Sequence, residues 1–309
     1  MRCFESGLLD GFRLRVAEKQ LGVYGIHLYK EGYAPLQFRF RSDDRTHLFS
    51  GSKAFTSVAV GIAIGEGRIS MADAVLSFFP EFAGEAAQGA EKITVRDLLQ
   101  MRAGHGGMLY TTHEQSQYTG GDWAKRFLSM PAVHPAGTRF LYDNGCSYML
   151  SRVLEKATGE TLKEYLVPRL FDPLGIPNPQ WHTCPDGHTL GATGLFLSTE
   201  EFSRLGRLLL FQGEWEGKEL VPADYIRQAA EDTVTVEGFG DPENQAGYGY
   251  QLWGCTCGNA YRADGKFGQY SVVFPQQRAV VTITAHNEGV ANDILRAIYD
   301  EVIPRLPDC

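Results

Sequence analysis

Ser50 and Lys53 stand three positions apart at the start of a long apolar segment, residues 54–65. On a helix, two side chains at this spacing lie on one face, about one turn apart. A serine hydroxyl becomes a strong nucleophile when a neighbouring group takes its proton, and an amine can do this once burial lowers its pKa. Because residues 54–65 are apolar on nearly every face, we expect a buried helix and a desolvated Lys53. The pair predicts an activated serine, although by itself it also fits a simple helix N-cap at Ser50.

Tyr142 and Asn144 form a second candidate group. They precede a segment, residues 145–158, in which apolar residues repeat at helical spacing. A phenol can relay a proton, and an asparagine amide can both donate and accept hydrogen bonds. We therefore expect both side chains on a loop that faces a cleft. Taken alone, the segment also fits an Asx cap beside an incidental tyrosine.

Lys266 and Gly268 form a third group, immediately before an expected strand at residues 270–274. A lysine at the start of a strand can direct a cation into a cleft, and a glycine lets a substrate approach the backbone. The alternative is a lysine that protects a sheet edge against aggregation. The three groups carry weight only together, because each short pattern also occurs by chance.

In this order, Ser-x-x-Lys, Tyr-x-Asn and Lys-x-Gly resemble the motif set of the serine β-lactamase and penicillin-binding-protein superfamily, in particular its branch of class C β-lactamases, D,D-peptidases and related esterases. Four further segments are similar to landmarks of that superfamily: residues 94–104, 135–140, 191–198 and 248–250. The resemblance covers the chain from about Leu8 to Ile303. It implies a serine hydrolase that acts through a covalent acyl-enzyme on an ester, amide or β-lactam-type carbonyl. This chemistry needs no cofactor and no metal ion.

The resemblance implies a role for each residue of the first two groups. Ser50 is the nucleophile that becomes acylated, and Lys53 is a candidate general base. Tyr142 is a second candidate base, or relays a proton toward the leaving group. Which of Lys53 and Tyr142 is the base stays open, and we expect their titrations to be coupled. Asn144 holds Lys53 and the amide groups of the substrate.

The third group is implied to shape the electrostatics of the site. Lys266 contributes positive potential near Tyr142 and near substrate carboxylates, and Gly268 supports substrate binding. The oxyanion hole consists of the backbone N–H groups of Ser50 and Gln269, which point to where negative charge develops.

Three positions bear on the choice of substrate or on the geometry of the motifs. Phe267 stands where penicillin-recognising members usually carry threonine or serine, which removes a hydroxyl expected to bind the carboxylate of a β-lactam or peptide. Gln269 replaces a residue that is often small. Both changes favour an esterase, amidase or peptidase over an enzyme that hydrolyses antibiotics. Asp143, in the middle of the tyrosine motif, is expected to point away from the site.

Sequence periodicity predicts strands at both ends of the chain and helices between them. Helices are expected near residues 8–19 and 291–302, and most of residues 50–230 favours helix. Strands are expected at residues 22–29, 36–41, 248–253, 260–262, 270–274 and 279–284.

This order predicts an α+β fold, with an antiparallel β-sheet built from both chain ends, flanked by helices, and a large helical insertion. We expect residues 1–309 to form a single β-lactamase-like catalytic domain. Its α/β part comprises residues 1–66 and 245–309, and its helical part comprises residues 67–244. The cleft is expected at the junction of the two parts, where ligand sites often lie.

The composition argues against several other classes of protein. The 309 residues include 29 Lys and Arg against 37 Asp and Glu, and this net charge of −8 does not favour nucleic-acid binding. No segment is long and apolar enough to span a bilayer. Residues 1–10 lack the apolar core of a signal peptide, so we expect a cytoplasmic location. The expected partner is a small-molecule or short-peptide substrate, and the sequence does not indicate the oligomeric state.

The cysteines are expected to be free thiols in that compartment. They are Cys3, Cys146, Cys184, Cys255, Cys257 and Cys309. His182 and the cysteines that could join it match no standard zinc spacing. His105 fits either the mouth of the cleft or a solvated loop.

A function of a different class also fits the fold. The chain could be a non-catalytic binding or scaffold protein that retains the penicillin-binding fold, since fold does not determine function. The presence of Lys53, Tyr142 and Lys266 together favours the hydrolase.

Overall fold

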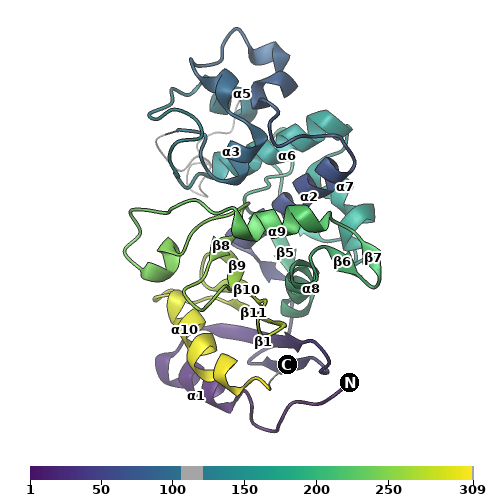
Figure 1. The fold of residues 1–309 in the computed structure, drawn as a ribbon, viewed down its shortest axis with the longest axis vertical. Coiled ribbons are helices and arrows are strands. Elements are labelled where there is room, and N and C mark those ends of the chain that lie inside the picture. The colour runs from purple at the N-terminus through teal and green to yellow at the C-terminus, as the bar shows by residue number, and fades with distance from the viewer. Residues whose placement is uncertain (106–120, 308–309) are drawn as a thin grey trace.

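A six-stranded antiparallel sheet is built from the two ends of the chain (Figure 1). The computed structural model describes residues 1–105 and 121–307. The strands follow one another across the sheet in the order β2-β1-β11-β10-β9-β8. They are β1 (Val23–Lys30), β2 (Leu36–Arg39), β8 (Trp253–Gly254), β9 (Tyr261–Gly265), β10 (Gln269–Phe274) and β11 (Ala279–Ala285). The first strand of the chain thus pairs with the last one, as the distribution of strand signals predicts.

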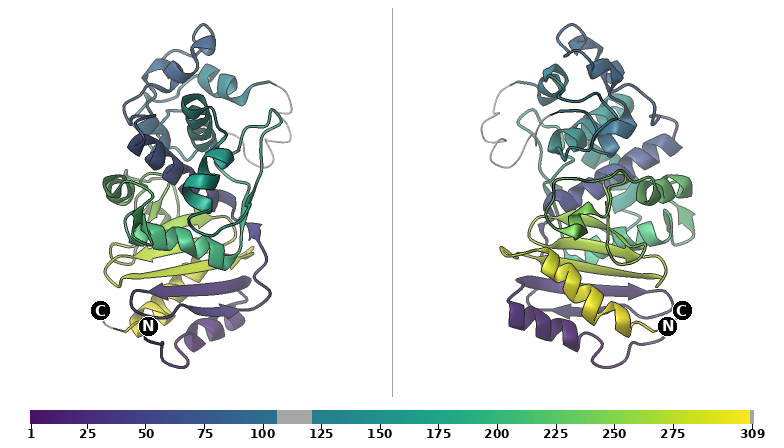
Figure 2. Two further views of the ribbon diagram at one scale, coloured as in Figure 1. Left: turned by 90° about the vertical axis from the view of Figure 1, so that its right-hand side faces the viewer. Right: turned by 60° about the vertical axis from the view of Figure 1, so that its left-hand side comes forward.

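Alternation along the central strands divides their apolar side chains between two cores. Tyr270 and Val272 pack on one face with α1 and α10, whereas Val273 belongs to the core on the face that α8 covers. These helices are α1 (Asp10–Lys19), α8 (Thr199–Leu210) and α10 (Asn292–Glu301). The layers are visible in Figure 2, where α1 and α10 lie below the sheet and the other helices lie above it. Because both faces are covered, every residue of β10 and β11 is buried.

The middle of the chain is mainly helical and stacks on the upper side of the sheet (Figure 1). Its helices are α2 (Ser52–Gly65), α3 (Val95–Leu99), α5 (Trp123–Ser129), α6 (Asn144–Thr158), α7 (Leu162–Leu166) and α9 (Ala223–Glu231). Helix α2 lies between this part and the sheet and contacts α6, α7, α9 and β9. Residues 52–63 of α2 are all buried, so the prediction of a buried helix after Ser50 is confirmed.

Short strands and turns interrupt the region that the sequence predicts to be largely helical. Strands β3 (Thr46–His47), β4 (Gln180–Trp181) and β5 (Leu195–Leu197) form a small sheet, and β6 (Glu214–Trp215) pairs with β7 (Lys218–Glu219). The short helical turns are η1 (Phe49–Gly51), η2 (Val75–Phe78), η3 (Pro80–Phe82), η4 (Ala90–Lys92), η5 (Val167–Phe171), η6 (Pro242–Gln245) and η7 (Ile303–Arg305). The small sheet of β3, β4 and β5 is central to the site described below.

The α+β fold class predicted from the sequence is confirmed, but one expected strand is wrong over most of its length. Of residues 248–253, only Trp253 belongs to a strand, β8. The Gly249 N–H donates to the Leu252 carbonyl oxygen at 2.8 Å, and Gln251 has a left-handed φ of 62°. This tight turn prevents the extended conformation that the apolar and aromatic residues of the segment would favour.

Among the described residues, no helix is long and apolar enough to cross a membrane. The five cysteines in that part of the chain are free thiols, and Cys309 lies outside it.

Candidate active site

Ser50 lies in the short turn η1, directly before α2. Hydrogen bonds to β5 anchor the turn on both sides. The Leu48 N–H donates to the Leu195 carbonyl oxygen at 2.9 Å, and the Leu195 N–H donates to Ser52 Oγ at 3.2 Å. Ser52 Oγ in turn donates to the carbonyl oxygen of Phe49 at 2.7 Å. Ser50 itself is half-buried, so its hydroxyl is held in place and can still meet a substrate.

Lys53 joins three segments of the chain at one point. Its Nζ lies 3.0 Å from Ser50 Oγ and 2.7 Å from Asn144 Oδ1, at the first residue of α6. It also donates to the carbonyl oxygen of Ala192, between β4 and β5, at 2.9 Å. Only 2% of Lys53 is exposed. The structure therefore brings Ser50, Lys53 and Asn144 together although α2 and α6 are far apart in sequence.

Burial changes the charge state of Lys53. Removal from water lowers the pKa of its amine from 10.5 to about 7, because the charged form loses its hydration. The negative charges of Asp143 and Asp264 oppose this shift and raise the pKa. Near neutral pH, a substantial fraction of Lys53 is therefore the neutral amine, which can accept a proton.

The hydrogen-bond partners of Lys53 fit a neutral amine. Asn144 Oδ1 and the Ala192 carbonyl oxygen can only accept hydrogen bonds, so they take the two N–H groups of such an amine. The nitrogen lone pair is then left for the third partner, the hydroxyl of Ser50. In this arrangement the Ser50 O–H donates to Nζ, which is the geometry required for proton removal.

Tyr142 lies beside the same amine. The Lys53 Nζ is 5.0 Å from the centroid of the Tyr142 ring. That ring stacks on Trp253 at 5.7 Å and meets Tyr248 edge-on at 6.2 Å. Burial raises the pKa of Tyr142, and a hydrogen bond with Ser50 lowers it by less. The phenol therefore keeps its proton near neutral pH and lies within reach of the Ser50 hydroxyl.

Asp143, which was expected to point away from the site, is turned into the protein interior beside His105. It is 2% exposed and caps α6, because its Oδ1 accepts a hydrogen bond from the Gly145 N–H at 2.7 Å. Its Oδ2 lies 3.8 Å from Nδ1 of His105, which is also 2% exposed and packs edge-on against Phe127. Neither of the two positions expected for His105 is correct, because the ring lies behind the tyrosine motif in the protein interior.

The Lys-x-Gly group lies in the turn that joins β9 to β10. The Gly268 N–H donates to the Gly265 carbonyl oxygen at 3.2 Å, which closes the turn, and β10 begins only at Gln269. Lys266 is exposed, and its Nζ lies 4.7 Å from the centroid of the Phe267 ring. The structure thus places the Lys266 ammonium on an exposed turn, against an aromatic ring.

Two backbone N–H groups of contacting segments are free to bind a substrate oxygen. Within the described residues, neither the Ser50 N–H nor the Lys266 N–H donates to a backbone carbonyl. The segments touch closely, since a Cβ added to Gly265 would lie 2.1 Å from the Leu48 carbonyl oxygen. Gln269, the expected second donor, is paired with Gly265 inside the sheet.

A hollow lies beside the residues that directly precede Tyr142 in the chain. It has a volume of about 720 Å³, and Phe140 and Leu141, the two residues before Tyr142, line it. Arg102 and Arg139 also line it and give it a cationic wall. Glu237 adds a negative charge to the same lining, and the described lining residues do not include Ser50, Lys53 or Tyr142.

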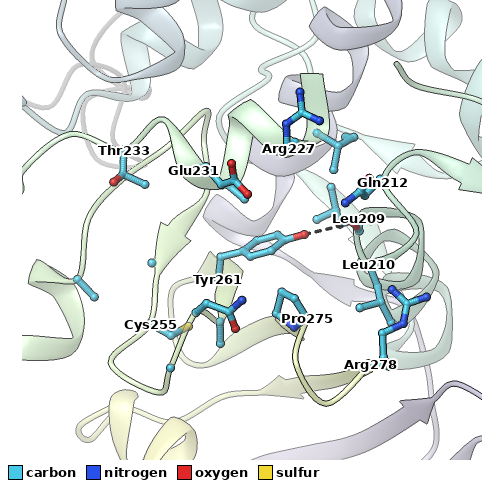
Figure 3. A pocket seen from close by; sticks show the side chains of 17 residues that line it. Leu209, Leu210, Gln212, Arg227, Glu231, Thr233, Cys255, Tyr261, Pro275 and Arg278 are labelled. Carbon is cyan, nitrogen blue, oxygen red and sulfur yellow. Dashed lines mark hydrogen bonds between the residues drawn. The ribbon is translucent and has the colours of Figure 1, made fainter. Parts of the chain in front are cut away.

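A second cavity, of about 350 Å³, lies apart from the candidate site (Figure 3). The Tyr261 side chain crosses it, and the Tyr261 hydroxyl donates to the Leu209 carbonyl oxygen at 3.2 Å. Arg227, Glu231 and Arg278 also line it. The described residues around this cavity include none of the candidate catalytic side chains.

Sequence reasoning missed three contributors to the site. Ala192 acts through its backbone carbonyl, which leaves no side-chain signal. Trp253 supports Tyr142 through a ring contact, and Asp264 raises the pKa of Lys53 through its charge. Of these three contributors, only Asp264 had a signal in the sequence. It is an acidic residue at the end of β9, two positions before Lys266 of the third motif.

Comparison with known proteins agrees with this geometry. The beta-lactamase family model matches residues 26–302. The 6-aminohexanoate-dimer hydrolase of Paenarthrobacter ureafaciens is 26% identical over 269 residues, which cover 82% of this chain and 65% of that protein. Lovastatin esterase of Penicillium rubens is 27% identical over 161 residues, which cover 45% of this chain and 40% of that protein. The chain thus spans less than two thirds of the length of these curated relatives.

A solved structure of a penicillin-binding protein homologue from Caulobacter crescentus has the same fold. It superposes with a TM-score of 0.76 at 17% identity, and the match covers 99% of each chain. At this identity the likeness establishes the architecture alone.

Proposed function

This chain belongs to the beta-lactamase family, and from that premise we propose that it is a serine hydrolase. It acts through a covalent acyl-enzyme on an ester, amide or β-lactam-type carbonyl. The names of its relatives, a dimer hydrolase and an esterase, support hydrolysis of this kind. Ser50 is the nucleophile, Lys53 the general base and Tyr142 the proton relay, while Asn144 positions the base.

One observation carries the proposal. The Lys53 Nζ touches Ser50 Oγ at 3.0 Å in a buried position where the pKa of the amine falls to about 7. A lysine used only for structure gains nothing from this position, because desolvation penalises its charge. A base whose pKa lies near the working pH is the most effective proton acceptor.

Acylation follows from the arrangement around Ser50. The Ser50 proton moves to the lone pair of Lys53 as Oγ forms a bond to the carbonyl carbon of the substrate. The carbonyl π electrons move to its oxygen, where backbone N–H groups stabilise the negative charge. The opposite pKa shifts of Lys53 and Tyr142 separate their roles, since the amine is available as a base and the phenol keeps its proton.

Collapse of the tetrahedral intermediate completes the transfer. The bond to the leaving group breaks, and Tyr142 gives its proton to that group while it receives the proton held by Lys53. Water then attacks the carbonyl carbon of the acyl-enzyme while its proton passes to the neutral amine of Lys53. As this second tetrahedral intermediate collapses, the bond between the carbon and Ser50 Oγ breaks, Lys53 returns the proton to Oγ, and the acid is released.

The free N–H of Lys266 is a better candidate for the second oxyanion donor than the N–H of Gln269. Lys266 follows Gly265 directly, and Gly265 packs against the turn that holds Ser50. The Ser50 and Lys266 N–H groups thus lie on two segments in contact, and both lack a backbone acceptor among the described residues. Gly268 contributes by allowing the turn, with its φ of 93°. We assign no role in proton transfer to the exposed Lys266 ammonium.

The third motif favours esters and amides over β-lactam antibiotics. Phe267 has no hydroxyl to bind a substrate carboxylate, and its ring occupies the turn beside the proposed oxyanion hole. The substrate is therefore a small molecule or short peptide whose reacting carbonyl needs no neighbouring carboxylate for binding.

We also propose that the α/β part and the helical part form one catalytic domain. Ser50 and Lys53 come from residues 1–66, Asn144 comes from residues 67–244, and Lys266 comes from residues 245–309. None of these parts contains the whole set, so the active site requires all of them.

Covalent labelling tests the nucleophile and separates the hydrolase from a non-catalytic scaffold. A fluorophosphonate should add one adduct to the wild-type protein and none to Ser50→Ala, as measured by intact mass. The same substitution should lower turnover of a p-nitrophenyl ester by at least about a thousandfold. Ser77→Ala, which removes an exposed serine hydroxyl, is the matched control and should label like wild type. Equal labelling of wild type and Ser50→Ala would refute the assignment.

The pH dependence of kcat/KM tests the base. We expect kcat/KM to rise as the pH increases, with the midpoint of this acidic limb near pH 7, because protonated Lys53 cannot accept the Ser50 proton. Asp143 raises the pKa of Lys53, so Asp143→Asn should move the limb to lower pH while the asparagine still caps α6. Asp224→Asn, at a side chain that is 76% exposed, is the control and should leave the limb in place. A limb that stays fixed or moves to higher pH in Asp143→Asn would contradict the assignment.

Lys266→Pro tests the second oxyanion donor. Residues 265–268 form a turn of type II, since Phe267 has a φ of 68°, Lys266 has a negative φ and Gly268 bonds to Gly265. Proline is favoured at the second position of such a turn, so this variant removes the N–H with little disturbance. We expect kcat to fall by about a hundredfold or more relative to Lys266→Ala, which loses the side chain but keeps the N–H. Equal rates in the two variants would contradict this assignment and favour the Gln269 N–H as the second oxyanion donor.

A further inference from the structure

Six aromatic and imidazole side chains form a continuous band beside Ser50, and we call this set the aromatic band. Its members are His47, Phe49, His182, Phe196, Phe267 and His286. Neighbouring ring centroids are 4.1 Å apart for His47–Phe49, 4.9 Å for His47–Phe196, 5.0 Å for His182–Phe196, 5.3 Å for Phe49–Phe267 and 4.2 Å for Phe267–His286. The band therefore runs without a break from the small sheet of β3, β4 and β5 to the turn between β9 and β10.

The band adjoins both sides of the proposed oxyanion hole. Phe49 directly precedes Ser50, and Phe267 directly follows Lys266. The two rings meet edge to face. Both are half-buried, so part of each ring faces solvent next to the nucleophile. A substrate bound for attack by Ser50 must lie close to these rings.

Phe49 and Phe267 are two of the nine non-glycine residues that have a positive φ in the described part of the chain. Phe49 has a φ of 50° and Phe267 a φ of 68°, in the left-handed region where glycine is relaxed and a bulky side chain is disfavoured. Strained residues of this kind persist where the surrounding structure holds them for a functional purpose. The two rings are therefore held beside Ser50 at some conformational cost.

The imidazole nearest to Ser50 in the band is uncharged near neutral pH. Burial, with a smaller contribution from the neighbouring His182, lowers the pKa of His47 to about 4. The geometry agrees, because His47 Nε2 accepts a hydrogen bond from the Gly194 N–H at 3.0 Å and so carries no proton. The part of the band next to Ser50 is therefore neutral and aromatic.

We propose that the aromatic band is an acyl-binding subsite that selects substrates whose acyl group carries an aromatic ring. This inference rests on the proposed hydrolase function and specifies its substrate class. The reacting carbonyl carbon has three substituents, and two of them are already placed. Its oxygen lies at the N–H groups of Ser50 and Lys266, and its leaving group lies at Tyr142, which protonates it. The acyl chain is the remaining substituent, and Phe49 and Phe267 are the side chains that flank the oxygen site.

Aromatic rings favour this ligand over an aliphatic chain of similar size. Offset and edge-to-face contacts between rings stabilise a complex beyond the burial of apolar area alone. Phe49 and Phe267 already meet edge to face, and this is a geometry in which a further aromatic ring can join them.

The test compares three p-nitrophenyl esters, the acetate, hexanoate and phenylacetate. Each kcat/KM is divided by the rate of hydroxide hydrolysis of the same ester, which removes differences in intrinsic reactivity. In the wild type we expect the phenylacetate to exceed both other esters by at least about tenfold, the gain of a buried ring in contact with aromatic partners. Phe267→Gly should reduce this preference to about threefold or less, because it removes one of the two flanking rings.

Two further variants make the test specific. Phe267→Tyr keeps the ring and should retain the preference. Phe40→Ala removes a phenylalanine that is 40% exposed beside β2, at the opposite edge of the sheet from β8, and should leave the preference at the wild-type value. Thermal melting checks folding, and Phe267→Gly should melt no lower than wild type, since glycine relieves the left-handed strain.

The outcomes separate this inference from the proposed function. Turnover of the acetate that depends on Ser50 but shows no preference for the phenylacetate overturns the subsite and leaves the hydrolase intact. An equal gain for hexanoate and phenylacetate overturns the aromatic selectivity. A preference that survives in Phe267→Gly overturns the role of the band. The absence of turnover and of Ser50 labelling with every ester overturns the proposed function, and the subsite with it.

Discussion

Desolvation of the Lys53 amine is the interaction on which the rest of the site depends. In water the amine holds its proton and cannot activate Ser50. Inside the protein, the loss of hydration favours the neutral form, and the nearby charges of Asp143 and Asp264 limit the shift so that the pKa stays near 7. The pKa of Lys53 is therefore set by two opposing effects, since burial lowers it and the two carboxylates raise it. A fold that buried the amine less completely would leave it protonated.

The fold maintains this burial by joining segments that are distant in sequence. Helix α2 is enclosed by α6, α7 and α9, and its first turn is tied to β5 by the hydrogen bonds of Leu48 and Ser52. Asp143 fixes the first turn of α6, which brings Asn144 to the amine. The close contact between Gly265 and Leu48 sets the turn of β9 and β10 against the nucleophile. Each of these contacts positions a polar group that a single helix or strand could not place alone.

The sequence predicted those features that depend on local spacing. The three-residue separation of Ser50 and Lys53 and the apolar character of residues 54–65 were enough to predict a shared helix face and a buried amine. Residues 270–274 were predicted to form a strand, and strands at both chain ends predicted the antiparallel sheet. These inferences succeeded because helical and strand periods translate directly into burial.

The sequence did not predict features that depend on turns and on contacts between segments. The direction of Lys266 is set by the left-handed φ of Phe267 and Gly268, and a lysine next to a glycine carries no sign of that conformation. Asp143 was expected only to point away from the site, and its burial as the cap of α6 beside His105 was not predicted. The aromatic band was not foreseen, because its members come from five separate stretches of the chain.

Direct titration of the Lys53 side chain tests the central claim of this account. Heteronuclear NMR of protein labelled at lysine can follow the Lys53 Nζ or Cε resonance with pH, and loss of that signal in Lys53→Met identifies it. The account predicts a titration in the folded protein with a pKa near 7. A pKa close to the ordinary value of 10.5 would contradict it, because Lys53 would then be an ammonium ion at neutral pH and could not accept the Ser50 proton.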